Sequence, residues 1–120
     1  MKKVTIYALK LVEGKYYIGM TRNMEERYRE HEEGGEFASQ WTNKYRPIEI
    51  LETYEYTDDR KFKGKYSSSK LQKIENQLTL KYMEKCGWNN VRGGCWSIID
   101  IKEPFALRNK SLGSLQEFFV

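Results

Sequence analysis

The sequence predicts a single small domain that mixes β-strands with α-helices. Its 120 residues suit one compact domain, which at this length can bury about two-thirds of its unfolded surface without disulfides. Runs rich in β-branched and aromatic residues occupy positions 4–11, 15–20 and 48–56. Helix-start signals at Asn23 and Ser69 open two segments with helical features. These observations place the chain in the α/β class.

The first two strand-like runs form a predicted hairpin, because only residues 12–14 separate them. Alternation along the first run places Tyr7 on the face opposite Ile6, pointing away from the main apolar set. In the second run, Tyr17 lies on the face opposite its two sequence neighbours. Gly19 interrupts this run and indicates a bulge or a close approach by another backbone or a ligand.

A helix is predicted to follow Asn23 and to run to about Glu33, where a pair of glycines ends it. Asn23 is a good N-cap, and Glu26 stands three residues on, where its side chain can reach back to the cap N–H. Arg27 and His31 are neighbours on this helix because they are four residues apart.

The middle of the chain predicts one further strand. Residues 36–46 are ambiguous and can hold a short helix, which Pro47 would end. The run that follows alternates well enough to form a third strand, with Ile48, Ile50 and Tyr54 on its inward side. 

Residues 57–69 are polar and are predicted to form an exposed loop. Ser69 and Gln72 make a second capping-box pattern, which opens a helix that ends at Gly87. The apolar positions at helical spacing in this segment are Leu71, Ile74, Leu78 and Tyr82.

Two apolar features follow the second helix. Residues 96–101 can form a short fourth strand, and the tail from 104 to 120 is amphipathic, so it can pack on the domain or on a second copy. No internal repeat or long linker divides the chain. We therefore expect one domain over residues 1–120.

The charge balance leans slightly toward polyanionic partners. Lysines and arginines number 21 against 17 acidic residues, a net charge of +4. No apolar run approaches the length of a membrane span, and the first residues lack a signal-peptide pattern, so we expect a cytoplasmic or nuclear protein that is not secreted. The 2 cysteines cannot build a disulfide framework, and with the single His31 they do not make a zinc set.

One cluster of residues suits chemistry. Tyr7 and Tyr17 lie on adjacent predicted strands, and the helix that carries Arg27 and His31 must pack back on the same sheet. Glu75 can join them from the edge of the packed face of the second helix. Two phenols, a guanidinium, an imidazole and a carboxylate can supply a proton acceptor, a phosphate clamp and a metal ligand. Each residue alone has an ordinary structural reading, such as tyrosines packing across strands, and the case rests on their joint occurrence.

The functional residues also follow a familiar order. Along the chain come Ile6-Tyr7, Tyr17-Ile18-Gly19, Arg27 eight residues later, the helical Glu75, and Asn90 just before Val91-Arg92-Gly93-Gly94. This order resembles the GIY-YIG nuclease superfamily, over residues 4 to about 94. The resemblance implies a small three-stranded antiparallel sheet flanked by helices, and cleavage of DNA with one divalent metal ion.

Two positions depart from the pattern of the superfamily. Thr5 stands where the first glycine of the name is expected, a change that we treat as minor because that position is structural. Met20 stands where the excision-repair branch has a lysine, which argues against a close relation to that branch. His31, one helical turn after the arginine, is instead similar to the homing and restriction branches.

The resemblance also implies a role for each residue of the cluster. Glu75 would bind one Mg²⁺ or Mn²⁺ ion, and Arg27 would neutralise the charge that builds on the phosphate. Tyr7 or Tyr17 would take the proton from the attacking water, helped by a nearby cation such as Arg27, His31 or the metal. We favour Tyr7, with Tyr17 and His31 orienting it and the water.

Supporting positions complete the expected site. Gly19 would be structural, and Asn90, or with less support Asn89, would hold the metal-binding helix or a phosphate by hydrogen bonding. Arg92 belongs to a predicted turn and could also meet a phosphate. A basic cluster of Lys61, Lys63, Lys65 and Lys70 can be a footprint for the DNA backbone, and is equally well explained as a solubilising loop.

The sequence therefore favours a metal-dependent endonuclease acting on duplex or branched DNA, with no membrane association. The alternative is a catalytically silent nucleic-acid-binding module, or a subunit of a larger DNA-processing assembly. No separate DNA-recognition domain is visible, so specificity would come from residues 36–47 and 57–69, from a homodimer formed through the tail, or from a partner protein. We expect low intrinsic sequence specificity.

Overall fold

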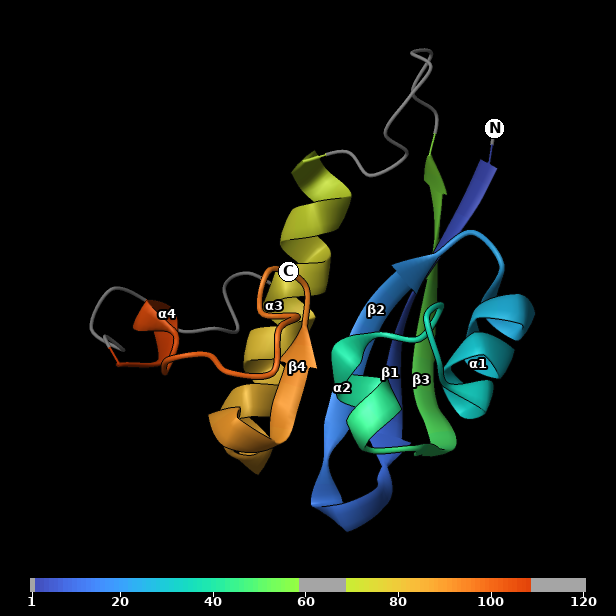
Figure 1. Ribbon diagram of the computed structural model, residues 1–120. Helices are drawn as coiled ribbons and strands as arrows, with labels where there is room; N and C mark the ends of the chain where they lie inside the picture. Colours follow the sequence, from blue (N-terminus) through green and yellow to red (C-terminus); the bar gives the residue numbers. More distant parts are fainter. Residues whose placement is uncertain (1, 59–68, 109–120) are drawn as a thin grey trace.

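The computed structural model of the protein describes residues 2–58 and 69–108, which form a mixed sheet with helices on both faces (Figure 1). The strands are β1 (Lys2–Leu11), β2 (Tyr16–Thr21), β3 (Pro47–Asp58) and β4 (Val91–Gly93), in the order β3-β1-β2-β4. Strand β1 pairs antiparallel with both β2 and β3, whereas β4 lies parallel to β2. The α/β class is confirmed, but the expected three-stranded antiparallel sheet is wrong, because β4 adds a fourth, parallel strand.

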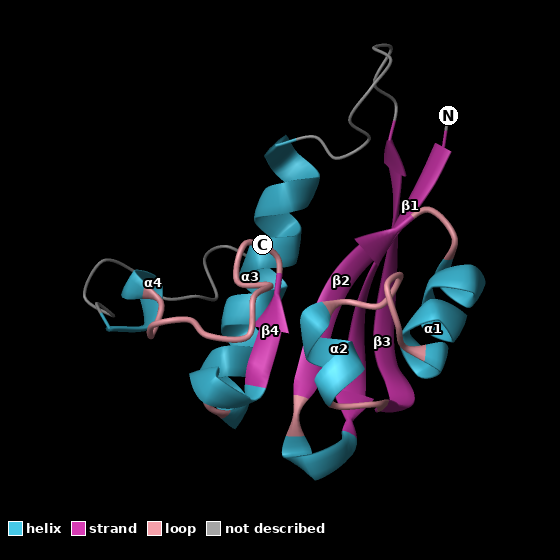
Figure 2. Ribbon diagram, in the orientation of Figure 1, coloured by secondary structure: helices cyan, strands magenta, loops and turns pink. Residues whose placement is uncertain are grey.

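Helices lie on both sides of this sheet (Figure 2). They are α1 (Met24–Glu33), α2 (Gln40–Lys44), α3 (Ser69–Cys86) and α4 (Phe105–Arg108), with 3-10 turns η1 (Val12–Gly14) and η2 (Trp88–Asn90). Among the described residues, no helix has the length and apolar character needed to cross a membrane. The short helix expected within residues 36–46 is confirmed as α2.

Both faces of the β1–β2 hairpin are buried. Ile6, Ala8 and Ile18 pack against α3, whereas Tyr7 and Tyr17 belong to a second core together with Trp41 of α2. The predicted division of the strand residues between two faces is therefore confirmed. The tyrosine face does not point outward, however, because α1 and α2 cover it.

Local signals explain the start of α1. Asn23 accepts a hydrogen bond from the Glu26 amide at 3.0 Å, as the capping pattern predicts. The reciprocal bond differs from the expected one, because the Glu26 carboxylate accepts from the side-chain amide of Asn23 at 3.3 Å, and the Asn23 backbone N–H donates to Thr21 instead. The helix ends at Glu33 before Gly34, as predicted.

Strand β3 corrects one expectation. Ile48, Ile50 and Tyr54 were expected inward, yet they are 53%, 40% and 40% exposed. Strand β3 lies at the edge of the sheet, and a register shift opposite Ala8 and Leu9 breaks its alternation. Beyond this irregularity, Ile50 pairs with Leu9 on the side of α1, whereas Tyr54 pairs with Ile6 on the side of α3.

The strand expected at residues 96–101 is also corrected. The fourth strand is β4, and Trp96 makes only an isolated bridge with Gly93. The Arg92 side chain donates to the carbonyls of Ile98 and Ile99, so that this segment turns around a guanidinium instead of extending along the sheet. Helix α4 then packs against α3, while residues 59–68 and 109–120 lie outside the described part of the chain.

Candidate active site

Three rings form the centre of the candidate site, on the sheet face covered by α1 and α2. The ring centroids of Tyr7 and Tyr17 lie 6.3 Å apart, and that of His31 lies 6.0 Å from Tyr7 and 5.1 Å from Tyr17. Strands β1 and β2 supply the phenols, and α1 supplies the imidazole. These are three of the five residues that the sequence nominates as catalytic, and the other two, Arg27 and Glu75, interact with both phenols.

Gly19 makes room for Tyr7. The two residues are partners in the β1–β2 ladder, and a Cβ atom at Gly19 would lie 2.3 Å from the Tyr7 hydroxyl oxygen. The ladder runs without a register shift at this point, so Gly19 marks a close approach and not a bulge. The approaching group is a side chain of the site itself.

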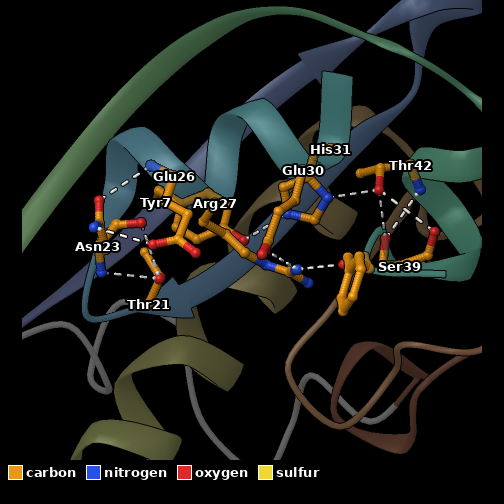
Figure 3. Close-up of polar contacts among 10 residues, drawn as sticks. Tyr7, Thr21, Asn23, Glu26, Arg27, Glu30, His31, Ser39 and Thr42 are labelled. Carbon is orange, nitrogen blue, oxygen red and sulfur yellow. Dashed lines mark hydrogen bonds and ion pairs between the residues drawn. The ribbon is translucent and has the colours of Figure 1, made fainter. Parts of the chain in front are cut away.

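His31 is fully buried and hydrogen-bonded at both nitrogens. Its Nε2 lies 2.9 Å from the hydroxyl oxygen of Tyr7, and its Nδ1 lies 2.7 Å from Oγ1 of Thr42 (Figure 3). Burial, reinforced by the charge of Arg27, lowers the pKa of His31 to about 3. The imidazole is therefore neutral at physiological pH, and His31 is not one of the cations that could lower the pKa of Tyr7.

Arg27 is fixed at the rim of the ring cluster. One terminal nitrogen donates to Glu30 Oε1 at 2.8 Å and to the Phe37 carbonyl at 2.5 Å (Figure 3). Burial lowers the pKa of Arg27, but the bond to Glu30 and the proximity of Tyr7 and Tyr17 outweigh that effect and raise it overall. The guanidinium is thus a permanent, positioned cation beside both phenols.

The two phenols are neutral in the resting site. Burial raises the pKa of Tyr7 and of Tyr17, and the nearby Arg27 guanidinium offsets only part of the increase. The Glu75 carboxylate adds a smaller increase to the pKa of each tyrosine, so it is close enough to act on both. Glu75 therefore belongs to the same electrostatic environment as the ring cluster, although it comes from α3.

Glu75 has the properties of a ligand for a hard cation. The residue is 8% exposed, and its Oε1 accepts from Gln72 Nε2 at 2.9 Å. Burial raises the pKa of Glu75 to about 7, opposed by that hydrogen bond alone, with no described cation stabilising the carboxylate. Among the side chains that the structure describes, no three His, Cys, Asp or Glu residues converge. A single carboxylate suits an ion such as Mg²⁺, which keeps several waters and takes other oxygens from a substrate phosphate.

Comparison with known proteins gives one match. The family model of the GIY-YIG catalytic domain matches residues 3–89, well over half of the chain. The chain belongs to the GIY-YIG family. Neither the curated proteins nor the solved structures provide a match. GIY-YIG proteins are typically endonucleases, so membership indicates a nuclease with DNA as its substrate.

Asn90 holds the helix that carries Glu75. Its Nδ2 donates to the Cys86 carbonyl at the end of α3 at 2.8 Å, and its Oδ1 accepts from Lys15 Nζ at 2.8 Å. Nearer the middle of α3, Asn76 Oδ1 accepts from the Cys95 amide at 3.0 Å. These contacts fix α3 against the segments before and after β4, and thereby set the position of Glu75.

Arg92 has a structural environment in this GIY-YIG domain. The residue is 3% exposed, and its guanidinium lies 4.3 Å above the ring of Trp41. Its nitrogens donate to four backbone carbonyls, those of Trp88, Val91, Ile98 and Ile99. The structure therefore uses Arg92 to hold the chain around β4 and leaves no exposed guanidinium there for a phosphate.

Three polar partners of the site were not identified as such from the sequence. They are Ser39, Thr42 and Gln72. Ser39 had a readable signal, because serine is a favoured N-cap residue and stands within the ambiguous segment 36–46. Nothing in the local sequence marks Thr42. Of the expected basic footprint, Lys70 is exposed in the first turn of α3, and Lys61, Lys63 and Lys65 lie outside the described residues.

Proposed function

We propose that the protein is a metal-dependent endonuclease that hydrolyses DNA phosphodiester bonds beside Tyr7, Arg27 and Glu75. One observation carries the proposal: the Tyr7 hydroxyl lies 2.9 Å from a neutral imidazole and beside a fixed guanidinium. A proton acceptor and a phosphate-binding cation are thus adjacent. Membership in the GIY-YIG family supports the same reaction class.

Tyr7 is the proposed proton acceptor. In the reaction the water oxygen forms a bond to phosphorus, the bond from phosphorus to the leaving 3′-oxygen breaks, and the water proton moves to Tyr7 Oη. A neutral phenol can accept this proton when its own proton passes to Nε2 of His31. Burial disfavours both the phenolate and the imidazolium in the resting site, so the transfer depends on the negative charge that the bound phosphate brings.

Arg27 is the proposed phosphate clamp. Its contacts with Glu30 and the Phe37 carbonyl fix the guanidinium before substrate arrives, so little reorganisation is needed in the transition state. A positioned donor of this kind typically contributes about 3 kcal/mol to catalysis. Tyr17, whose ring lies 5.1 Å from that of His31, completes the wall against which the water is oriented.

Glu75 is the proposed ligand of one Mg²⁺ or Mn²⁺ ion. When bound, the ion would polarise the scissile phosphate and stabilise the leaving oxygen. Within the protein, Gln72 holds the carboxylate by one oxygen and leaves its remaining acceptor positions for the ion. Asn90 contributes indirectly, because it fixes the end of the same helix.

A plasmid-cleavage assay tests the proposal. Supercoiled, branched and single-stranded DNA would be incubated with the protein and Mg²⁺, Mn²⁺ or EDTA. We expect nicking that requires the metal, and its loss by at least about 100-fold in Arg27→Ala and Glu75→Gln. Matched controls are Arg29→Ala on α1 and Glu84→Gln on α3, both at exposed positions of the same helices, which should cleave normally.

Two results would contradict the proposal that the protein is an endonuclease. One is an absence of metal-dependent cleavage by a folded wild-type protein on every substrate. The other is cleavage that survives in both Arg27→Ala and Glu75→Gln, since a contaminating nuclease would then be responsible. If cleavage is absent while DNA binding is retained, the protein is the nucleic-acid-binding module instead.

A further inference from the structure

We infer that Thr42 and Ser39 of the α2 cap are positioning residues that fix one tautomer of His31, with Nδ1 protonated and Nε2 open to the Tyr7 proton. The inference rests on the proposed function, because it explains how Tyr7 becomes able to accept a proton. Neither residue would touch the substrate.

The four side chains form one continuous row of polar contacts (Figure 3). Tyr7 Oη lies 2.9 Å from His31 Nε2, His31 Nδ1 lies 2.7 Å from Thr42 Oγ1, and Thr42 Oγ1 lies 2.9 Å from Ser39 Oγ. His31 and Thr42 are both 0% exposed. Water therefore does not compete at His31 or Thr42, and the hydrogens of these two residues must be directed to a partner within the row.

The Thr42 hydroxyl determines in which direction hydrogen bonds are donated along the row. A neutral imidazole carries one N–H, so Nδ1 donates to Thr42 only if the Thr42 proton goes elsewhere. Two acceptors lie on the same turn of α2: Ser39 Oγ at 2.9 Å and the Ser39 carbonyl at 3.4 Å. When the Thr42 proton goes to Ser39, an Oγ1 lone pair faces Nδ1 and requires a proton there.

Ser39 supports the same direction. Its Oγ accepts the Thr42 backbone N–H at 3.0 Å, as the N-cap of α2. A hydrogen bond with the Ser39 side chain lowers the pKa of Tyr17, so the Tyr17 phenol oxygen offers the Ser39 proton an acceptor other than Thr42. With the Ser39 proton directed there, the remaining Ser39 lone pair can accept from Thr42. Donation in one sense, from Tyr7 through His31, Thr42 and Ser39 to Tyr17, then satisfies every contact of the row.

This direction determines what Tyr7 can do. With Nε2 unprotonated, the Tyr7 proton points at His31, Arg27 donates to one lone pair of Oη, and the other lone pair can accept from water. In the other tautomer, Nε2–H donates to Oη, so His31 offers no acceptor for the phenol proton, and Tyr7 cannot take a proton from water without becoming positively charged. The α2 cap thus determines, through His31, whether Tyr7 can accept a proton, although neither Ser39 nor Thr42 is bonded to Tyr7.

The tautomer can be measured directly, because the chain contains 1 histidine. Nitrogen-15 NMR of the imidazole at neutral pH, without DNA or metal, distinguishes Nδ1–H from Nε2–H. We expect Nδ1–H in the wild type, a shift toward Nε2–H in Thr42→Val, and the wild-type pattern in Thr42→Ser. Thr79→Val is the matched control, since Thr79 is equally buried and its hydroxyl bonds to a backbone carbonyl of α3.

Cleavage kinetics provide the second measurement. Thr42→Val should lower kcat about 10- to 100-fold with KM unchanged, and Thr42→Ser should recover most of the activity. Ser39→Ala removes the acceptor of the Thr42 proton at a more accessible position, so it keeps the test open if Thr42→Val does not fold. It should give a mixture of tautomers and an intermediate kcat.

Distinct outcomes separate this inference from the proposed function. An Nε2–H wild type, or folded Thr42→Val and Ser39→Ala variants that keep the wild-type tautomer, overturns the role of the α2 cap even if the protein cleaves DNA. A tautomer that responds as expected in a protein that never cleaves DNA leaves the structural assignment intact and overturns the enzyme.

Discussion

His31 is the residue whose surroundings constrain it most. It sits between Tyr7 and Thr42 with no exposed surface, and burial holds its pKa near 3. A histidine whose pKa is lower in the folded state than in the unfolded chain resists protonation in the fold. Its contribution to stability is therefore complete above the unfolded pKa of about 6.5 and is lost as the pH falls toward 3.

This difference predicts a pH-dependent stability. Between pH 7 and pH 5 the free energy of unfolding should fall by about 2 kcal/mol on account of His31. Urea unfolding in EDTA at the two pH values measures it. The wild type should lose about that much more than His31→Gln, which has no group to protonate.

The comparison with His31→Gln is needed because Glu75 acts in the opposite sense. Its pKa is raised to about 7, so its protonation favours the folded state as the pH falls. Both proteins share this contribution, and it cancels in the difference. An equal pH dependence in the two proteins would show that His31 protonates freely and that the row of hydrogen bonds is not rigid.

Gly19 is a second residue whose substitution should have a clear effect on stability and activity. A methyl group there would lie 2.3 Å from the Tyr7 hydroxyl oxygen, and Tyr7 is too buried to swing away easily. We expect Gly19→Ala to cost about 1 to 3 kcal/mol of stability and to lower kcat at least 10-fold, because Tyr7 must leave its contact with His31. Thermal unfolding and plasmid cleavage check both effects.

Gly14→Ala is the matched control for Gly19→Ala. An added Cβ at Gly14 meets nothing within 4 Å, although its φ of +69° makes alanine strained there. It should lose about 1 kcal/mol of stability and keep its cleavage rate. Unchanged cleavage in a folded Gly19→Ala protein would mean that the position of the Tyr7 hydroxyl is not critical.

Among the secondary-structure elements, β4 and the segments around it are held in place by one buried cation, Arg92. Arg92 joins four backbone carbonyls and the face of Trp41, which no lysine side chain can reproduce. We expect Arg92→Lys to lose about 2 to 4 kcal/mol in urea unfolding, because several carbonyls would lose a donor. DNA affinity of the folded fraction should not change, and a selective loss of affinity at full stability would restore a phosphate-binding role.

Elements with strong local signals could be predicted from the sequence. Helix α1 carries its cap at Asn23 and its stop at Gly34, and the β1–β2 hairpin carries short-range alternation and a tight connection. Strand β4 could not be found this way, because it has only 3 residues and pairs in parallel with a strand distant in sequence. The prediction of which β3 residues face inward was wrong for a related reason, because the register shift in β3 depends on its pairing with β1.

The candidate site likewise has features that could be predicted from the sequence and features that depend on contacts between distant elements. The order of Tyr7, Tyr17, Arg27 and Glu75 was visible because it resembles the pattern of the GIY-YIG superfamily. The protonation state of His31 was not visible, because it follows from burial by α1 and α2 together. The same holds for Thr42, whose hydroxyl matters only through its contact with His31 across two helices.

The layered architecture explains how groups from both sides of the sheet can meet. The tyrosine face lies under α1 and α2, whereas Glu75 comes from α3 on the opposite side. Strand β4 pairs only with residues 16–18 of β2, so among the described strands the rest of that edge, from Gly19 onward, has no partner. The carboxylate nevertheless raises the pKa of both tyrosines.

The charge distribution of the whole chain predicts weak, salt-sensitive DNA binding. With a net charge of only +4, few phosphates can be neutralised at once, and we expect log K to fall against log salt with a slope of about −3 to −5. Fluorescence anisotropy with Glu75→Gln in EDTA measures binding without cleavage. Lys70→Gln, in the first turn of α3, should weaken binding and reduce the slope by about one unit.

Lys85→Gln is the matched control, because it removes the same charge from an exposed position at the other end of the same helix. Lys70 and Lys85 are 15 positions apart, which spans roughly 22 Å along α3, more than two Debye lengths at physiological salt. If DNA binds only at the start of α3, Lys70→Gln should reduce the slope of log K against log salt and Lys85→Gln should leave it unchanged. Equal effects of both variants would mean that DNA senses the net charge of the protein and not a defined face, and the basic cluster would then be a solubilising feature.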